Sequence, residues 1–245
     1  MSRFWNSLNK TPPEAPSRGI DSSRIRGLLF DVDGTLSDTD DHMVQQISGF
    51  LQPLSWLFKD GNPRKFSRGL VMFSETPGNF LYSIADRVGL DAIIAGVYNW
   101  LAQQRSPQPI EEDDYQIIPG VKEMLASLAG RYPMAVVSAR DARSTGRFLE
   151  YFDLLPFFDT IVTSQTCRHT KPFPDPVIFA AEQLGLPAED CLMIGDTIVD
   201  VRSGKAAGAQ TLAVLCGFGT LRELQRAGAD LLLPTTPDLL KILKS

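Results

Sequence analysis

Short runs of apolar residues alternate with segments of helical periodicity over most of the chain. Most of the apolar runs are continuous rather than alternating, which is typical of strands covered on both faces of a parallel sheet. Strands are expected at residues 27–30, 134–138, 160–162, 191–194, 211–215 and 231–233, and helices at 121–129, 142–151, 175–184 and 198–207. This alternation predicts an α/β fold with a Rossmann-like parallel sheet and right-handed crossovers.

One long segment lacks strand patterns. Between residues 39 and 118 the apolar spacing indicates only helices, at 42–58, 79–88 and 91–104. An all-helical domain inserted after the first strand is therefore expected over residues 39–118, with the α/β core formed by 24–38 and 119–245. Residues 1–23 contain several prolines and no regular periodicity, so a flexible tail is expected there.

Composition places the chain among ordinary globular proteins, with 245 residues of which 43% are hydrophobic. The net charge of −5 argues against a broad nucleic-acid or anionic-membrane surface. No apolar run approaches the roughly 20 residues that a membrane-spanning helix needs. A cytoplasmic protein with neither nucleic-acid nor membrane partners is expected, and the sequence leaves monomer and homodimer both open.

Polar residues stand where the predicted strands end. Because ligands bind beyond the carboxyl ends of parallel strands, these residues are expected to meet at one edge of the sheet. They are Asp31, Asp33, Gly34 and Thr35 after the first strand, Ser138 and Arg140 after the second, Lys171 beyond the third, and Asp196 with Asp200 after the fourth.

Four of these residues are aspartates, and their mutual repulsion needs a counter-charge. Two unit charges about 4 Å apart repel by about 4 kcal/mol at an effective dielectric constant of 20. A site with only oxygen ligands favours Mg²⁺ over zinc. Asp31, Asp33, Asp196 and Asp200 are therefore candidate metal ligands.

The other residues suit a phosphoryl group. Lys171 offers a positive charge and Ser138 a hydroxyl donor, and the backbone N–H groups of Gly34 and Thr35 could face the same ligand. Asp31 would be placed to attack phosphorus, and Asp33 to protonate the leaving oxygen. Each piece alone is more often a turn, a helix cap or a surface residue, so the prediction depends on their combination.

Four motifs resemble the haloacid dehalogenase superfamily, in the branch that contains phosphoglycolate phosphatase and beta-phosphoglucomutase. They are FDVDGTLSDT, VVSAR, KPFPDP and MIGDTIVDVRSGKAAG. The resemblance implies that Asp31 is the nucleophile and a Mg²⁺ ligand, and that Asp33 is the general acid/base and binds the metal through its carbonyl. It further implies that Ser138 and Lys171 hold the phosphoryl oxygens, and that Asp196 and Asp200 complete or support the metal site.

The resemblance also implies that the helical insertion is a mobile cap that carries specificity. In its basic loop at 59–69, Arg64, Lys65 and Arg68 are candidate contacts for a substrate carboxylate or second phosphate. One departure from the family pattern is Arg140, which belongs to a Ser-Ala-Arg sequence where Asn usually follows the serine. Arg140 either adds an anion contact or points to solvent.

The expected function is a Mg²⁺-dependent phosphatase that hydrolyses a small phosphorylated metabolite through an aspartyl-phosphate, with phosphoglycolate as the first candidate substrate. A hexose-phosphate mutase of the same superfamily is an alternative, because it shares the motifs and the aspartyl-phosphate. A catalytically silent binding protein that keeps the fold is a second alternative.

Overall fold

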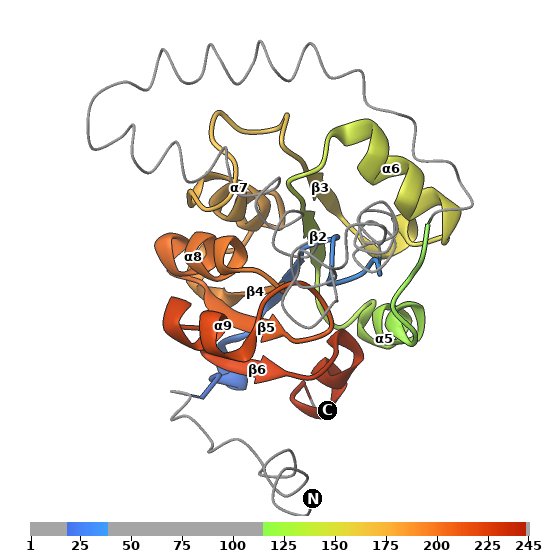
Figure 1. Ribbon diagram of the computed structural model, residues 1–245. Coiled ribbons are helices and arrows are strands. Elements are labelled where there is room, and N and C mark those ends of the chain that lie inside the picture. Colours follow the sequence, from blue (N-terminus) through green and yellow to red (C-terminus); the bar gives the residue numbers. More distant parts are fainter. Residues whose placement is uncertain (1–18, 39–114, 244–245) are drawn as a thin grey trace, which may run out of the picture.

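The computed structural model describes residues 19–38 and 115–243 of the chain. Within these residues, six strands form one parallel sheet in the order β3-β2-β1-β4-β5-β6, which confirms the predicted α/β, Rossmann-like class (Figure 1). The strands are β1 (Gly27–Phe30), β2 (Met134–Val137), β3 (Thr160–Val162), β4 (Cys191–Gly195), β5 (Gln210–Val214) and β6 (Leu231–Leu233).

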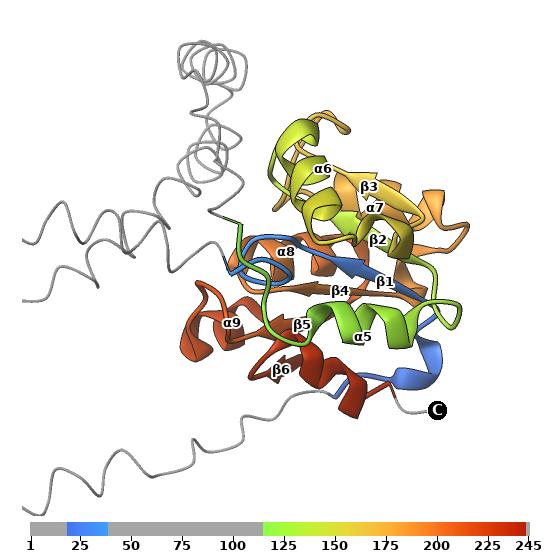
Figure 2. The ribbon, with the colours of Figure 1, turned by 90° about the vertical axis from the view of Figure 1, so that its right-hand side faces the viewer.

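Helices cover both faces of this sheet. Figure 1 shows α7 (Asp175–Gln183), α8 (Ile198–Ala207) and α9 (Leu221–Ala227) on one face. Figure 2 looks onto the other face, which carries α5 (Val121–Leu128) and α6 (Ala142–Tyr151). Short 3₁₀ helices complete the described part: η2 (Ser22–Arg24), η6 (Leu155–Phe157), η7 (Ala188–Asp190) and η8 (Thr236–Lys241).

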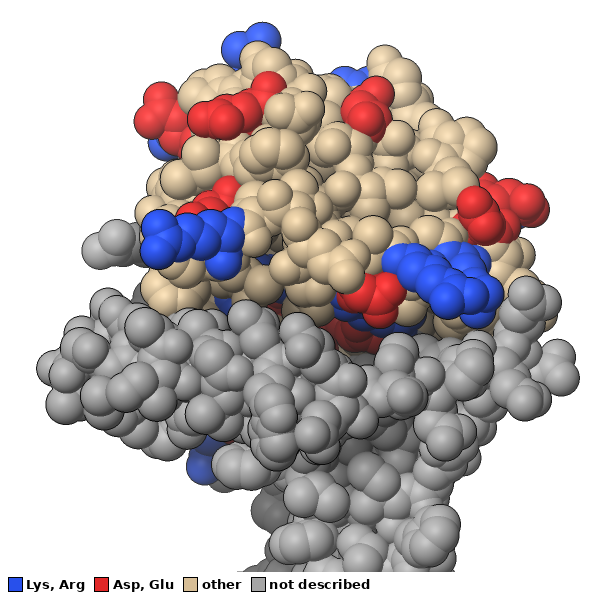
Figure 3. All heavy atoms as spheres, turned by 90° about the horizontal axis from the view of Figure 1, so that it is seen from above, with Lys and Arg blue, Asp and Glu red and all other residues tan. Residues whose placement is uncertain are grey.

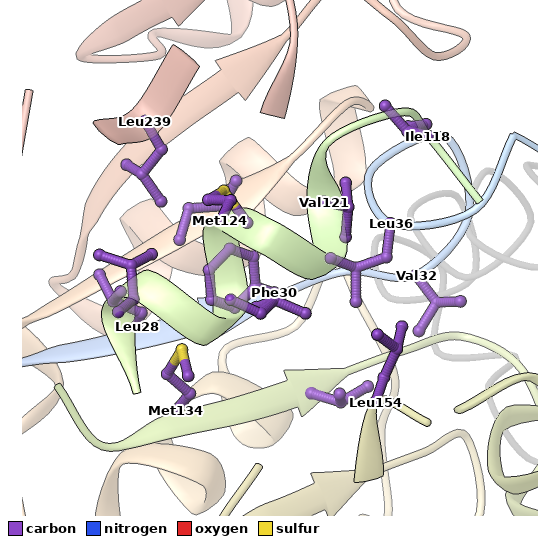
Figure 4. Packing of buried hydrophobic residues seen from close by; sticks show 14 of the residues in the cluster. Leu28, Phe30, Val32, Leu36, Ile118, Val121, Met124, Met134, Leu154 and Leu239 are labelled. Carbon is purple, nitrogen blue, oxygen red and sulfur yellow. The ribbon is translucent and has the colours of Figure 1, made fainter. Parts of the chain in front are cut away.

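The central strand β1 explains why its apolar run is continuous. Successive side chains of a strand point to opposite faces, so a strand covered on both sides needs apolar residues at every position. Leu28 and Phe30 pack in the larger hydrophobic cluster with Val121 and Met124 of α5 (Figure 4). Leu29 points the other way, into a second cluster with residues of α7. All four residues of β1 are buried.

Helix α9 is the element that the apolar pattern did not predict. Its signal is a capping box, in which the Thr220 side chain accepts from the Glu223 N–H and the Glu223 carboxylate accepts from the Thr220 N–H. Gly228 ends the helix in the left-handed conformation. Other element ends differ from the expected ones by a residue or so, as at β5, which begins at Gln210 and ends at Val214.

Residues 115–118, the described end of the expected insertion, lie against the core. Ile117 forms an isolated bridge with Ser37, and the Ile118 N–H donates to the Leu36 carbonyl at 3.0 Å. Within the expected tail, the Asp21 N–H donates to the Gln210 side chain at 2.7 Å, so the described residues 19–23 are joined to the core. The division into tail, core and cap stays a prediction, because residues 1–18 and 39–114 lie outside the described ranges.

In the described ranges, no helix is both long and apolar enough to pass through a bilayer. On the face of the molecule seen from above, Lys and Arg side chains lie in small separate groups, several of them close to Asp or Glu side chains (Figure 3). The visible surface therefore carries mixed charges, in keeping with the modest net charge of the sequence.

A core substitution tests this packing. Phe30 is fully buried, and its ring meets that of Phe158 edge-on at a centroid distance of 6.2 Å. Phe30→Ala is expected to lower the free energy of unfolding by about 3–5 kcal/mol, because it removes buried apolar area and leaves a cavity. Urea unfolding followed by circular dichroism measures this change. The control is Ile178→Ala at a partly exposed position of α7, for which a loss of more than about 1 kcal/mol would contradict the assigned burial.

Candidate active site

The loop that follows β1 brings Asp31 and Asp33 to the carboxyl edge of the sheet. The Asp31 N–H donates to the Ile194 carbonyl at 2.9 Å, so Asp31 still lies in register with β4. The chain then turns sharply, with the N–H groups of Leu36 and Ser37 both donating to the Val32 carbonyl at 2.8 Å. The Asp31 carboxylate is consequently fixed at the strand end, where it is almost fully buried.

Lys171 joins two of the predicted aspartates. Its Nζ donates to Oδ1 of Asp31 and to Oδ1 of Asp200, each at 2.6 Å. The lysine side chain is only 3% exposed, so this ammonium group is neutralised by the two carboxylates rather than by solvent. The contact links three segments that are distant in sequence: the end of β1, the loop before α7 and the first turn of α8.

Asp196 is held by groups from two other loops, and Asp200 by the cap at the start of α8. The Asp196 carboxylate accepts from the Phe218 N–H at 2.7 Å and from the Thr35 hydroxyl at 3.4 Å. Asp200 forms a capping box with Thr197, whose N–H donates to Oδ2 of Asp200 at 3.0 Å. Both aspartates are fully or almost fully buried, so their orientations are set by these bonds and not by solvent.

The three buried aspartates Asp31, Asp196 and Asp200 form a group that could hold a metal ion. Each offers one carboxylate oxygen, and these oxygens lie within 4.8 Å of one another. Mg²⁺ takes oxygen ligands at about 2.1 Å in octahedral geometry, so adjacent ligands lie about 3.0 Å apart and opposite ligands about 4.2 Å apart, and the group would have to contract to bind the ion through all three oxygens. When all three are ionised, the single charge of Lys171 leaves a surplus of two negative charges, which a divalent cation would balance.

The pKa values of the group reflect this surplus. Burial and, next, the negative charge of Asp200 raise the pKa of Asp31 to about 7, although Lys171 acts in the opposite direction. Burial tends to lower the pKa of Lys171, but the charges of Asp200 and Asp31 outweigh it and the net pKa is raised. Lys171 is therefore firmly protonated, while Asp31 needs further positive charge to be fully ionised near neutral pH.

Asp33 has a different partner. Its Oδ2 accepts from Nε of Arg140 at 2.7 Å, and its Oδ1 accepts from Nη2 of the same guanidinium, in a two-bond ion pair. Of the two readings that the sequence left open for Arg140, the structure shows an anion contact, although the anion is the protein's own Asp33. Asp31 and Asp33, one residue apart, therefore belong to two separate ion pairs.

Three other predicted residues lie at this edge, with bonds that partly differ from expectation. The Ser138 hydroxyl accepts from the Arg140 N–H at 3.1 Å. The N–H groups of Gly34 and Thr35 donate within the loop, to the carbonyls of Ser37 at 2.9 Å and Val32 at 3.3 Å. The expectation that these two N–H groups face a phosphoryl group is thus not met, because the tight turn uses them internally. The cap candidates Arg64, Lys65 and Arg68 lie outside the described residues.

Sequence reasoning missed the residues that support Asp196. A side chain at Gly217 or Gly219 would collide with Asp196, because an ideal Cβ at either position would lie well within 3.0 Å of its atoms. The glycines allow the loop after β5 to approach Asp196 and let the Phe218 N–H bind it. The signal was present as Gly217-Phe218-Gly219 directly beyond a predicted strand, but it matches no complete dinucleotide motif. Thr197, which forms the helix cap with Asp200, was also missed. Its Thr-x-x-Asp spacing is the sequence signal for such a cap.

Comparison with known proteins now identifies the family. A protein-family model described as haloacid dehalogenase-like hydrolase matches residues 91–214, slightly more than half of the chain. The probable phosphatase IndB of Dickeya dadantii is 30% identical over 209 residues, which cover 85% of this chain and 89% of that protein. The chain belongs to the haloacid dehalogenase-like hydrolase family. Another relative, the pyrophosphatase PpaX of Oceanobacillus iheyensis, is 28% identical over 220 residues, or 89% of this chain and 96% of PpaX.

Solved structures of haloacid dehalogenase-like proteins share the fold. A family member from Streptococcus pneumoniae aligns with a TM-score of 0.64 at 22% identity, over 91% of this chain and 100% of that chain. A predicted phosphoglycolate phosphatase from Haemophilus somnus aligns with a TM-score of 0.60 at 20% identity, over 90% and 99%. Because relatives named phosphatase and pyrophosphatase match most of its length, the chain is a phosphohydrolase of this family.

The close approach of Gly217 to Asp196 can be tested. Gly217→Ala is expected to lower phosphatase activity at least about tenfold, since the new Cβ must displace the Asp196 carboxylate or its loop. The matched control is Gly146→Ala, where a Cβ meets nothing within 4 Å and the helix α6 gains a residue of higher helix propensity. Steady-state assays and thermal unfolding of both variants provide the measurement. Equal activity in the two variants would contradict the proposed support of Asp196.

Proposed function

We propose that this haloacid dehalogenase-like phosphatase hydrolyses a small phosphomonoester with Mg²⁺, through an aspartyl-phosphate formed on Asp31. The observation that carries the proposal is the buried contact of Lys171 with Asp31 and Asp200 beside Asp196. Such a group is costly for folding alone, because buried like charges repel and buried ions lose hydration. We infer that this destabilisation is retained because the same charged group binds a cation and a phosphoryl group.

The proposed metal ligands are carboxylate oxygens of Asp31, Asp196 and Asp200 and, by the family resemblance, the backbone carbonyl of Asp33. When bound, Mg²⁺ would neutralise the carboxylates and polarise the phosphoryl oxygens. Lys171 holds the Asp31 carboxylate through Oδ1 and brings its own positive charge to the phosphoryl oxygens. Ser138, at the end of β2, is the proposed hydroxyl donor to those oxygens.

In the first step, a carboxylate oxygen of Asp31 attacks phosphorus and forms the aspartyl-phosphate. The bond from phosphorus to the leaving oxygen breaks, and Asp33 transfers a proton to that oxygen. In the second step, Asp33 takes a proton from a water molecule while the water oxygen attacks phosphorus. The bond to Asp31 then breaks, which releases inorganic phosphate and restores both aspartates.

Removing the proposed nucleophile tests this mechanism. Asp31→Asn is expected to reduce Mg²⁺-dependent hydrolysis of p-nitrophenyl phosphate by about 10³-fold or more, because an amide cannot attack phosphorus in place of the carboxylate. The fold is expected to persist, since the amide also removes a buried negative charge that faces Asp200. Thermal unfolding checks the fold, and excess EDTA is expected to abolish the wild-type rate. Asp153→Asn, at a largely exposed carboxylate, serves as the charge-matched control. Full activity of Asp31→Asn would rule out Asp31 as the nucleophile.

The product separates the phosphatase from the mutase alternative. The protein is incubated with Mg²⁺ and, separately, with phosphoglycolate, hexose phosphates, nucleotides and pyrophosphate, the last because a relative is named a pyrophosphatase. Free inorganic phosphate is expected from at least one compound, because water completes the second step. Phosphorus NMR of the reaction mixtures distinguishes the products. An isomeric sugar phosphate without free phosphate would instead support the mutase.

A further inference from the structure

The ion pair between Arg140 and Asp33 has no part in the mechanism described so far. Its two residues come from different strand ends, since Asp33 follows β1 and Arg140 follows β2. The carboxylate presents both oxygens to the guanidinium, one to Nε and one to Nη2. This fork geometry gives the strong, oriented form of an arginine–carboxylate contact.

The surroundings hold Arg140 firmly in this place. Its N–H donates to the Ser138 hydroxyl at 3.1 Å, and its carbonyl accepts from the Ser164 N–H at 3.0 Å. The guanidinium carbon lies 5.6 Å from the centre of the Phe148 ring, and only 10% of the arginine side chain is exposed. Arg140 thus lies on a fixed loop in a partly desolvated position, where a charge contact is stronger than in water.

The pair conflicts with the proposed work of Asp33. To transfer a proton, Asp33 must approach the leaving oxygen of the substrate to about 3 Å. Both oxygens of the Asp33 carboxylate accept from one guanidinium, so the carboxylate is turned toward the arginine. Asp33 can therefore serve the leaving oxygen only after Arg140 has at least partly exchanged to another anion.

The position of Arg140 indicates where that other anion comes from. The leaving oxygen must lie beside Asp33, and Nε of Arg140 lies 2.7 Å from Asp33. A negative group attached two or three bonds beyond the leaving oxygen therefore comes within reach of the guanidinium. An uncharged leaving group offers Arg140 no negative charge in exchange for that of Asp33.

We propose that Arg140 is a positioning and specificity residue that holds Asp33 in the substrate-free protein and exchanges to a second anionic group, a carboxylate or phosphate, on the leaving side of the substrate. The proposal rests on the proposed function, since it assigns Asp33 to the leaving oxygen. It narrows the substrate class to phosphate esters or anhydrides whose leaving group is itself an anion. Binding of that anion then releases Asp33 for the proton transfer.

The test compares two substrates that differ in the second anion. Phosphoglycolate and ethyl phosphate both have a short alkoxide leaving group, but only phosphoglycolate carries a carboxylate two bonds from the leaving oxygen. Pyrophosphate is the third substrate and offers a phosphate in place of the carboxylate. For each, kcat and KM are measured with Mg²⁺ in the wild type and in the variants Arg140→Gln and Arg140→Lys.

In the wild type, kcat/KM is expected to be higher for phosphoglycolate, pyrophosphate or both than for ethyl phosphate. In Arg140→Gln this preference is expected to fall about thirtyfold, mainly through KM, which corresponds to the loss of a hydrogen bond to a charged group. Arg140→Lys is expected to restore part of the preference because it keeps the charge. Loss of the preference for phosphoglycolate would show that Arg140 binds a carboxylate, and loss of the preference for pyrophosphate would show that it binds a phosphate.

Arg143→Gln provides the matched control, because Arg143 lies on the exposed side of α6 three residues further along the chain and its removal takes away the same charge. This control is expected to keep the wild-type preference.

An equal fall in kcat/KM for all three substrates in both Arg140 variants would show a purely structural role and overturn the proposal. An unchanged preference in Arg140→Gln would overturn it as well. If the wild type released phosphate from none of the compounds in the wider panel, the proposed function itself would fail, which is a distinct result.

Discussion

The structure depends most on one buried positive charge, the Lys171 ammonium group between Asp31 and Asp200. An ammonium group removed from water is strongly destabilising unless anions and hydrogen bonds replace its hydration. Here two carboxylates do so at 2.6 Å each. Because these carboxylates come from the end of β1 and the first turn of α8, the charge requirement fixes the relative positions of three distant segments. Each carboxylate thus supplies one of the two hydrogen bonds that replace the hydration of the ammonium group.

The sheet order makes this arrangement possible. β1 lies between β2 and β4, so the residues that follow these three strands reach the same edge. The backbone then sets the directions of the side chains. In the turn after Asp31, two N–H groups donate to the Val32 carbonyl, and Thr197 fixes Asp200 through a helix cap. The glycines after β5 add the Phe218 N–H as a support for Asp196. Ordinary devices of helix capping and tight turning thus hold the carboxylates against their mutual repulsion.

Much of this was predictable from the sequence, for physical reasons that also explain the omissions. Continuous apolar runs revealed the strands of the parallel sheet, and the polar residues at their ends indicated which side chains meet. Helix α9 was missed because it is short and its signal lies in its cap rather than in apolar periodicity. The Arg140–Asp33 pair joins residues 107 positions apart, and its formation depends on loop conformation, which spacing does not encode. For the same reason, the internal use of the Gly34 and Thr35 N–H groups was not foreseen.

The two ion pairs explain how aspartates only one residue apart can have different chemical roles. Lys171 holds Asp31 within the carboxylate group, where burial and Asp200 raise its pKa and added positive charge favours its ionised form. Arg140 holds Asp33 outside that group of three, in a pair whose charges already balance. A cation that binds the group would therefore act mainly on the proposed nucleophile, whereas an anion that reaches Arg140 would act mainly on the proposed acid/base. Separate counter-charges would thus let a bound cation and a second anion of the substrate act on two neighbouring carboxylates independently.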